Sequence, residues 1–351
     1  MSGLFVLGLA LLPAGAWAGD YTDHDEDGDE LIYGDEDPHL IVNGDTEEGF
    51  LQAVGLGADI LGFTYVACTG SLITPRMILS AGHCGDGVPL ELVVAAGAAY
   101  FGETPDTAVA AVGFKSIEIH PDYEEISENG LTPPKFDVAV LELDQDAPDY
   151  LEPIWFRTKK MKNKDIGKDV VSVGFGITSG GGSDSGIKRS AVLTVASYDD
   201  QFLISNSATN KNNANICSGD SGGPQYYFDE DTGLWEQWAV HSWGDQNCLS
   251  TSGSTRTDLV ADWLLEKIEE IHGTSDRCEI NGHYDDGICD EFCDTLDPDC
   301  MTDPWDPNDN TDAADSTEVS ANGGCGCDVS PGPNGGWVVL LLGALGLRRK
   351  R

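Results

Sequence analysis

Between residues 41 and 273 the chain is divided into short apolar runs, and this pattern restricts the folds open to it more than any other feature. The runs are rich in Val, Ile, Ala, Phe and Thr and are separated by turns of Gly, Pro and Asp. They fall at 63–67, 77–81, 90–95, 138–143, 170–173, 191–196 and 238–243. Such spacing is typical of an all-β sandwich or barrel and argues against alternating strand and helix units. The segment 259–271 has apolar residues at helical spacing and ends at Gly273, so we expect one closing helix.

A serine bracketed by glycines is the strongest chemical signal. Residues 217–224 read Cys-Ser-Gly-Asp-Ser-Gly-Gly-Pro, and the small neighbours of Ser221 let the backbone fold back so that two N–H groups converge. A serine hydroxyl is a poor nucleophile unless a base takes its proton and a carboxylate orients that base. Upstream, Ser-Ala-Gly-His-Cys places His83 beside a cysteine after an apolar run. Phe-Asp-Val-Ala-Val-Leu places Asp137 at the start of a buried strand.

The order His, Asp, Ser and the three motifs resemble a trypsin/chymotrypsin-like serine protease over residues 41–273. Residues 41–44 (Ile-Val-Asn-Gly) resemble the family's mature N-terminus, and 174–176 (Gly-Phe-Gly) resemble its Gly-Trp-Gly turn, with Phe in place of Trp. Residues 242–244 (Ser-Trp-Gly) match the strand that pairs with the substrate backbone. The resemblance implies two six-stranded antiparallel β-barrels with a C-terminal helix and an active site in the cleft between the barrels.

The resemblance also assigns catalytic roles. It makes Ser221 the nucleophile, His83 the general base and then the general acid, and Asp137 the residue that orients His83. The backbone N–H groups of Gly219 and Ser221 would form the oxyanion hole, where the loss of one donor costs roughly 3–4 kcal/mol of transition-state stabilisation.

The resemblance places the floor of the substrate-specificity pocket at Asn215, six residues before Ser221. An Asp there would attract Arg or Lys, whereas Asn leaves a buried cation uncompensated, so we predict neutral P1 residues. The other substrate-binding residues implied are Ser242, Trp243, Gly244 and Ser254.

Activation is implied by the motif at 41–44. Family members are made as zymogens, and a cut between Leu40 and Ile41 would free an α-amino group to pair with Asp220. Leu40 would be the P1 residue of this cut and is not basic, so a trypsin-like activator is not expected. A neutral specificity pocket could accept Leu40, so self-activation is a hypothesis.

Ten cysteines point to an oxidising compartment. The resemblance pairs Cys68 with Cys84 and Cys217 with Cys248. A small acidic module at 274–300 holds four more cysteines, whose pairing the sequence leaves open: Cys278, Cys289, Cys293 and Cys300. About twenty residues cannot build a core, so two disulfides or a bound hard cation must hold them, and acidic oxygens favour calcium.

Both chain ends look like targeting segments. Residues 1–18 are typical of a signal peptide, 19–40 of an acidic propeptide and 301–324 of a flexible acidic linker. Residues 325–351 combine Cys-Gly-Cys, a short apolar run and a basic terminus, and they resemble the MYXO-CTERM class of sorting tails. The apolar run is too short for an ordinary membrane anchor, although membrane attachment through this tail stays open.

These features together predict a secreted, surface-retained, monomeric serine endopeptidase that acts on proteins or peptides and requires no cofactor or metal. A net charge of −42, from 61 acidic and 19 basic residues, excludes nucleic acid as a partner. The alternative is a catalytically idle surface adhesion or binding protein on the same fold, against which the complete triad argues.

Overall fold

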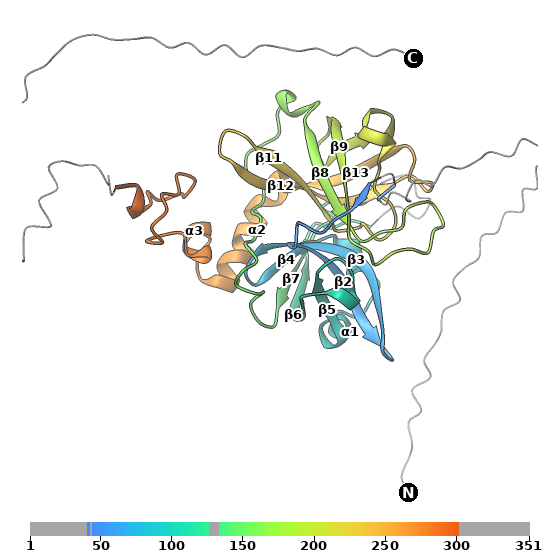
Figure 1. Cartoon of the computed structure of the whole chain (residues 1–351), viewed down its shortest axis with the longest axis horizontal. Coiled ribbons are helices and arrows are strands. Elements are labelled where there is room, and N and C mark those ends of the chain that lie inside the picture. The colour runs from blue at the N-terminus through green and yellow to red at the C-terminus, as the bar shows by residue number, and fades with distance from the viewer. Residues whose placement is uncertain (1–40, 43, 126–132, 302–351) are drawn as a thin grey trace, which may run out of the picture. The chain divides into compact units, whose positions relative to one another are not determined.

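Two β-barrels follow one another along the chain (Figure 1). The computed structural model describes residues 41–42, 44–125 and 133–301. The first barrel closes in the order β2-β3-β4-β7-β6-β5, and all its pairs are antiparallel. Its strands are β2 (Ala53–Ile60), β3 (Phe63–Thr74), β4 (Met77–Ser80), β5 (Gly97–Phe101), β6 (Ala110–Ile119) and β7 (Ala139–Leu143).

The second barrel closes in the order β8-β9-β10-β13-β12-β11, because β8 pairs with both β9 and β11. The short strand β1 (Asp45–Thr46) adds to β9. The six strands of the ring are β8 (Asp169–Gly174), β9 (Arg189–Tyr198), β10 (Phe202–Asn206), β11 (Pro224–Asp229), β12 (Leu234–Gly244) and β13 (Thr251–Arg256). The prediction of two six-stranded antiparallel barrels is therefore confirmed.

Alternating apolar side chains fill both barrels. Along β9 the side chains of Ala191, Leu193 and Val195 are buried, while those between them are half-buried, as a strand with one inward face requires. The core of the first barrel includes Val54, Leu72, Ile78, Phe101 and Leu143. The core of the second includes Leu193, Val195, Leu203 and Trp238. A third cluster joins the first barrel to the C-terminal helix through Leu79, Val140, Leu264 and Ile268.

The run at 90–95, expected to be a strand, forms a helix, and that prediction is wrong. It is α1 (Leu90–Ala96), which follows Pro89 and ends at Gly97. Leu, Glu and Ala in this run are strong helix formers, and proline is compatible with a helix start. The apolar residues Leu92, Val93 and Ala96 are spaced for one helical face, and all three line one apolar hollow beside the first barrel, which is described below.

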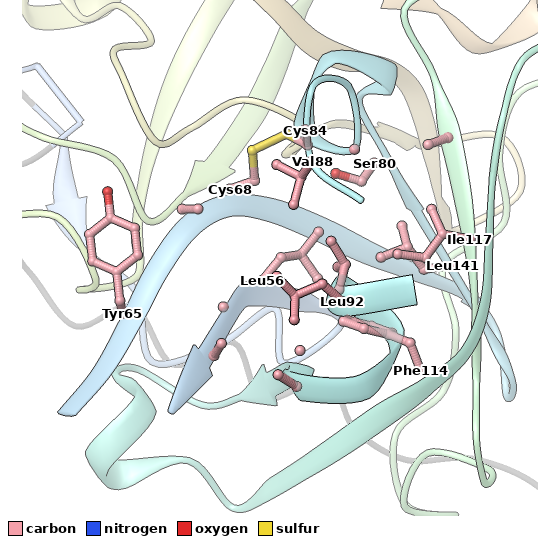
Figure 2. Close-up of a pocket in the computed structure, with 18 of the residues that line it drawn as sticks. Leu56, Tyr65, Cys68, Ser80, Cys84, Val88, Leu92, Phe114, Ile117 and Leu141 are labelled. Carbon is pink, nitrogen blue, oxygen red and sulfur yellow. A yellow bond between two sulfur atoms is a disulfide. The ribbon is translucent and has the colours of Figure 1, made fainter. Parts of the chain in front are cut away.

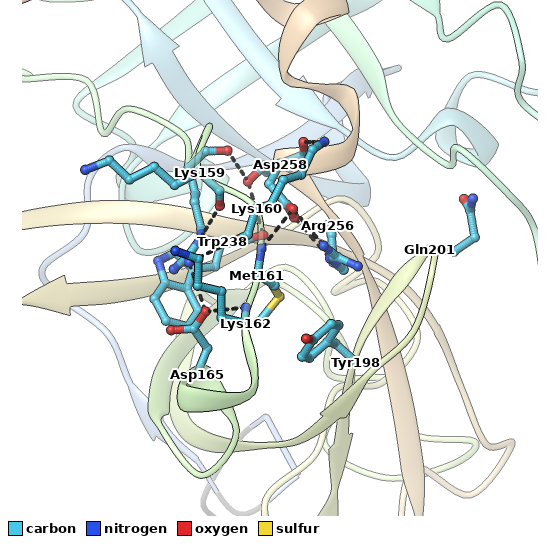
Figure 3. A network of polar contacts seen from close by, with 12 residues as sticks. Lys159, Lys160, Met161, Lys162, Asp165, Tyr198, Gln201, Trp238, Arg256 and Asp258 are labelled. Carbon is cyan, nitrogen blue, oxygen red and sulfur yellow. Dashed lines mark hydrogen bonds and ion pairs between the residues drawn. The ribbon is translucent and has the colours of Figure 1, made fainter.

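The closing helix is α2 (Thr257–His272), and it ends at Gly273 in the left-handed conformation, as the sequence predicts. Buried polar contacts fasten its first turn (Figure 3). The Asp258 carboxylate accepts two hydrogen bonds from the Arg256 guanidinium, at 3.0 and 2.7 Å, and one from the Met161 N–H at 3.1 Å. Lys160 Nζ donates to the Asp258 carbonyl at 2.5 Å. These contacts tie the helix start to β13 and to the loop around residue 160.

Residues 274–301 contain α3 (Arg277–Asn281) and belong to the same compact unit as the barrels. Disulfides join Cys278 to Cys293 and Cys289 to Cys300, which settles the pairing that the sequence left open. Ile280 packs against the cluster around α2. The predictions made for residues 1–40 and 302–351 lie outside the described residues. In the part of the chain that is described, no helix is both long and apolar enough to span a membrane.

Candidate active site

The side chains of His83 and Asp137 meet at one end of the first barrel. His83 lies in the 3-10 turn Gly82–Cys84 that follows β4, and Asp137 precedes β7, the neighbouring strand. Asp137 Oδ2 lies 2.8 Å from His83 Nδ1, and Oδ1 accepts the His83 backbone N–H at 2.9 Å. Because a carboxylate only accepts, Nδ1 carries the proton and Nε2 keeps its lone pair. His83 is 31% exposed and Asp137 is fully buried, so the ring can present a base to the solvent side.

Ser242 makes a contact that no motif in the sequence indicates. Its hydroxyl donates to Asp137 Oδ2 at 2.6 Å. Ser242 lies on β12 of the second barrel, so this hydrogen bond crosses from one barrel to the other. Together with the two contacts to His83, it leaves the buried carboxylate well satisfied.

The turn that carries Ser221 has the conformation that its glycines permit. Gly219 and Gly222 have φ angles of 96° and 84°, in the left-handed region. A Cβ on Gly222 would lie 2.1 Å from Ser80 Oγ and 2.3 Å from the Thr69 carbonyl oxygen. Glycine therefore allows this turn of the second barrel to approach the first.

Ser221 also lies close to the segment that carries His83. The Ser221 carbonyl accepts the Thr69 N–H at 2.8 Å. The same carbonyl oxygen lies 3.7 Å from Sγ of Cys84, the residue after His83. The structure thus brings the three predicted catalytic residues to one place where the barrels meet.

Every carbonyl group of residues 218–221 has a hydrogen-bond donor. The donors are the Ile177 N–H to Ser218 (2.9 Å), the Thr69 hydroxyl to Gly219 (2.9 Å), the Gly223 N–H and His241 Nδ1 to Asp220 (2.8 and 3.1 Å), and the Thr69 N–H to Ser221 (2.8 Å). In contrast, the N–H groups of Gly219 and Ser221 donate to no acceptor among the residues that the structure describes. Because C=O and N–H of a trans peptide point in opposite directions, the bound carbonyls fix where these N–H groups point. Two unpaired amides on one turn can receive a developing oxyanion.

A pocket of about 250 Å³ lies beside Ser221. Besides Ser221, the residues that line it are 216–218, 241–246 and Cys248. Ser242, Trp243 and Gly244, predicted to bind substrate, therefore line the pocket next to Ser221. The Cys217–Cys248 disulfide joins its walls, and Cys68–Cys84 flanks His83, in the pairing that the resemblance implies.

The other two predicted specificity residues do not line this pocket. Asn215 is wholly buried, where its N–H donates to the Val42 carbonyl at 3.3 Å and its Nδ2 lies 3.5 Å from the Ser250 carbonyl. Ser254 is wholly buried on β13, opposite His241. Asp245, which does line the pocket, has its carboxylate engaged by the N–H groups of Asn247 and Ser250, at 3.1 and 2.6 Å.

The predicted activation residues occupy the second barrel, except for Leu40, which lies outside the described residues. The Ile41 side chain is buried in the core of that barrel. The Asp220 carboxylate is wholly buried and accepts the N–H groups of Gly176 and Cys217, each at 2.8 Å. Burial raises the pKa of Asp220 to about 7, although these hydrogen bonds oppose the shift.

A separate apolar hollow of about 360 Å³ lies beside the Cys68–Cys84 disulfide (Figure 2). Leu56, Leu92 and Phe114 are among the side chains that line it, and none of the three predicted catalytic residues does. Among the described residues, His283, Asp286 and Asp290 of the cysteine module lie close enough together to hold a metal ion. A second group, around His83, includes the bonded sulfurs of Cys68 and Cys84, which are not free ligands.

Comparisons with known proteins agree with this two-barrel fold. The family model described as Trypsin matches residues 51–264, and the chain belongs to this family. It is 23% identical over 210 residues to Venom serine protease 34 of Apis mellifera, covering 57% of this chain and 51% of that protein. It is 27% identical over 236 residues to CLIP domain-containing serine protease B10 of Anopheles gambiae, covering 57% and 61%. It is 25% identical over 219 residues to Trypsin 5G1 of Aedes aegypti, covering 57% and 74%. The chain thus spans about half to three fifths of the first two relatives.

Proposed function

We propose that this protein hydrolyses peptide bonds within protein substrates through an acyl-enzyme. His83 Nε2 takes the proton of the Ser221 hydroxyl as Oγ attacks the scissile carbonyl. Asp137 holds the ring and stabilises the imidazolium cation, while the amides of Gly219 and Ser221 receive the oxyanion. His83 then gives its proton to the leaving amine, and an activated water molecule releases the acyl group by the same steps. These residues use no metal or cofactor.

This proposal rests on one observation: the same site contains an oriented base and backbone N–H groups that are free to bind an oxyanion. The 2.8 Å contact between His83 Nδ1 and Asp137 leaves Nε2 as the base. The bound carbonyls of residues 218–221 leave two amides available beside Ser221. A binding protein that only reuses the fold has no need of either feature, so both weigh against an idle adhesion protein.

A fluorophosphonate probe separates the two functions. The mature chain should be labelled at one residue and lose peptidase activity in proportion, whereas Ser221→Ala should not be labelled. A folded wild-type chain that neither reacts nor cleaves a peptide library would refute the endopeptidase and favour the binding protein.

We further propose that the enzyme prefers a neutral P1 residue. Asn215, which the resemblance assigns to the floor of the specificity pocket although it does not line the pocket described above, has no charge that could pair a buried cation. Both oxygens of the Asp245 carboxylate accept hydrogen bonds from its own loop. Cleavage of a P1-diverse peptide library, read by mass spectrometry, tests this preference. Efficient cleavage after Arg or Lys would contradict it.

Activation is proposed to follow a cut between Leu40 and Ile41. The antiparallel bridge between Val42 and Asn215 and the buried Ile41 side chain support a place for this segment inside the second barrel. Self-processing is tested by expressing the Ser221→Ala precursor and sequencing its N-terminus. A precursor that stays intact until traces of wild-type enzyme are added supports self-activation. One that already begins at Ile41 was cut by another protease.

Secretion and retention at the outer surface are proposed from the sequence of residues 1–18 and 325–351 and from the disulfides. Fractionation of cells expressing the full chain and a chain ending at residue 324 tests the role of the tail, since only the shorter one should be released freely.

The monomeric state also remains a prediction, and light scattering of the mature chain tests it. Calcium binding by the module also remains a prediction, and calorimetric titration of the mature chain with calcium chloride tests it.

A further inference from the structure

His241 holds the turn that carries Ser221 through both its backbone and its side chain. It lies on β12 and is wholly buried. Its carbonyl accepts the Gly222 N–H at 2.8 Å, and its N–H donates to the Gly223 carbonyl at 2.8 Å. Its ring nitrogen Nδ1 lies 3.1 Å from the Asp220 carbonyl oxygen. One residue thus contacts three of the peptide units around the nucleophile, those that join residues 220–221, 221–222 and 223–224.

The chemistry of these partners fixes the tautomer of the His241 ring. A carbonyl oxygen only accepts, so Nδ1 must carry the proton. Nε2 lies 3.2 Å from Ser172 Oγ and accepts from that hydroxyl. Burial lowers the pKa of His241 to about 4, so the ring is neutral at neutral pH.

The carbonyl that His241 contacts belongs to an oxyanion-donor peptide. The unit between Asp220 and Ser221 carries the Asp220 carbonyl at one end and the Ser221 N–H at the other. A hydrogen bond to the carbonyl fixes the plane of this unit and polarises it, which makes its N–H a better donor. The side chain of His241 therefore acts behind the oxyanion hole without touching the substrate's oxygen.

Thr69 holds the neighbouring peptide from the first barrel. Its wholly buried hydroxyl accepts the Phe175 N–H at 3.0 Å and donates to the Gly219 carbonyl at 2.9 Å. That carbonyl belongs to the peptide unit between the two donor units. The Thr69 backbone N–H holds the Ser221 carbonyl at 2.8 Å, so Thr69 contacts the turn twice.

We propose that Thr69 and His241 are positioning residues of the oxyanion hole, one supplied by each barrel. Their side-chain donors fix the peptide units that aim the Gly219 and Ser221 amides. The inference rests on the proposed endopeptidase function and assigns these two side chains a part in the rate of the chemical step.

The test uses the mature chain and variants that remove or keep each donor. Thr69→Val removes the hydroxyl at nearly constant shape and keeps the backbone N–H, while Thr69→Ser keeps both. His241→Leu removes the ring donor, and His241→Asn offers an amide donor near the position of Nδ1. Ser172→Ala is the matched control, because it removes a buried hydroxyl from the other side of the His241 ring without touching the turn.

Each variant is measured for kcat and KM on a peptide substrate, with active sites counted by end-point fluorophosphonate labelling. Inhibition constants are measured for a peptide boronic acid, whose tetrahedral adduct occupies the oxyanion hole, and for a product peptide, which does not. Thr69→Val and His241→Leu should lower kcat about tenfold or more and weaken the boronate by a similar factor, since misplaced oxyanion donors act on the transition state. KM and product binding should stay within about twofold, because the ground state uses other contacts.

The conservative variants keep the inference falsifiable if His241→Leu does not fold. Thr69→Ser and His241→Asn should recover most of the lost kcat, and Ser172→Ala should stay within about threefold of wild type. Wild-type kcat and boronate binding in Thr69→Val would overturn the inference while leaving the proposed function intact. A folded wild-type chain that cleaves nothing would overturn the proposed function, and the inference with it.

Discussion

The charge state of Asp220 should make stability depend on pH in a chain whose N-terminus does not begin at Ile41. Its pKa of about 7 lies above the ordinary value of 3.8 because the carboxyl is wholly buried. The folded state therefore binds the proton more tightly than the unfolded state, and stability falls as pH rises from about 4 to about 7. Full ionisation costs about 4 kcal/mol, with a slope of at most about 1.4 kcal/mol for each pH unit. The nearby Arg189 lowers the pKa of Asp220 and Asp184 raises it, and the pKa of about 7 already includes both effects.

A free α-amino group at Ile41 should remove most of this dependence by pairing with the carboxylate. The comparison uses two Ser221→Ala chains, one beginning at Ile41 and one with a single glycine before it, so that all acidic residues are shared. Urea unfolding between pH 4 and pH 8 gives the free energy of unfolding of each. The extended chain should lose about 4 kcal/mol relative to the other across this range. Parallel profiles for the two chains would refute both the pairing and the proposed activation.

Three further predictions concern the site and the core. Ser221→Ala and His83→Ala should each lower kcat by about 10⁴-fold or more with KM within a few-fold, because the penalty falls on the transition state, and a substitution that left peptide hydrolysis at the wild-type rate would contradict the triad. Asn215→Asp should shift cleavage towards Arg and Lys at P1 in the same library assay, and an unchanged preference would show that this position does not set specificity. Leu79→Ala, in the wholly buried cluster beside α2, should lower the free energy of unfolding by about 2–5 kcal/mol in urea titrations, whereas a change below about 1 kcal/mol would mean that the cluster closes around the gap.

Much of the fold could be predicted from the sequence because local patterns carry it. The runs at 77–81 and 191–196 fall in β4 and β9, and the helical spacing at 259–271 falls in α2. The run at 90–95 misled because a short apolar segment has the same composition in a buried strand and in a helix that covers a barrel. The strand β13 (Thr-Ser-Gly-Ser-Thr-Arg) gives no apolar run, and its pairing with β10 and β12 decides its structure.

The candidate site likewise contains residues that sequence motifs indicate and residues that they do not. His83, Asp137 and Ser221 stand in motifs whose small or charged neighbours mark them, so the sequence could indicate them. Thr69 and His241 stand in apolar strands where a hydroxyl or a ring could equally serve packing. Their roles come from which carbonyl each side chain faces, and that depends on how the two barrels dock.

We therefore infer that the docking of the barrels sets the geometry of the proposed catalytic site. Thr69 of the first barrel holds the turn of the second, and Ser242 of the second holds Asp137 of the first at 2.6 Å. A further buried contact, from Ser71 Oγ to Gln237 Oε1 at 2.6 Å, fixes the same junction away from the site. Apolar packing tolerates small slips, whereas buried hydrogen bonds lose most of their value when donor and acceptor separate, because neither finds water. A polar junction thus specifies one register of the two barrels, in which Asp137 holds His83 and, among the described residues, the N–H groups of Gly219 and Ser221 have no acceptor. Changes at this junction should lower the rate of acylation before they lower the stability of either barrel.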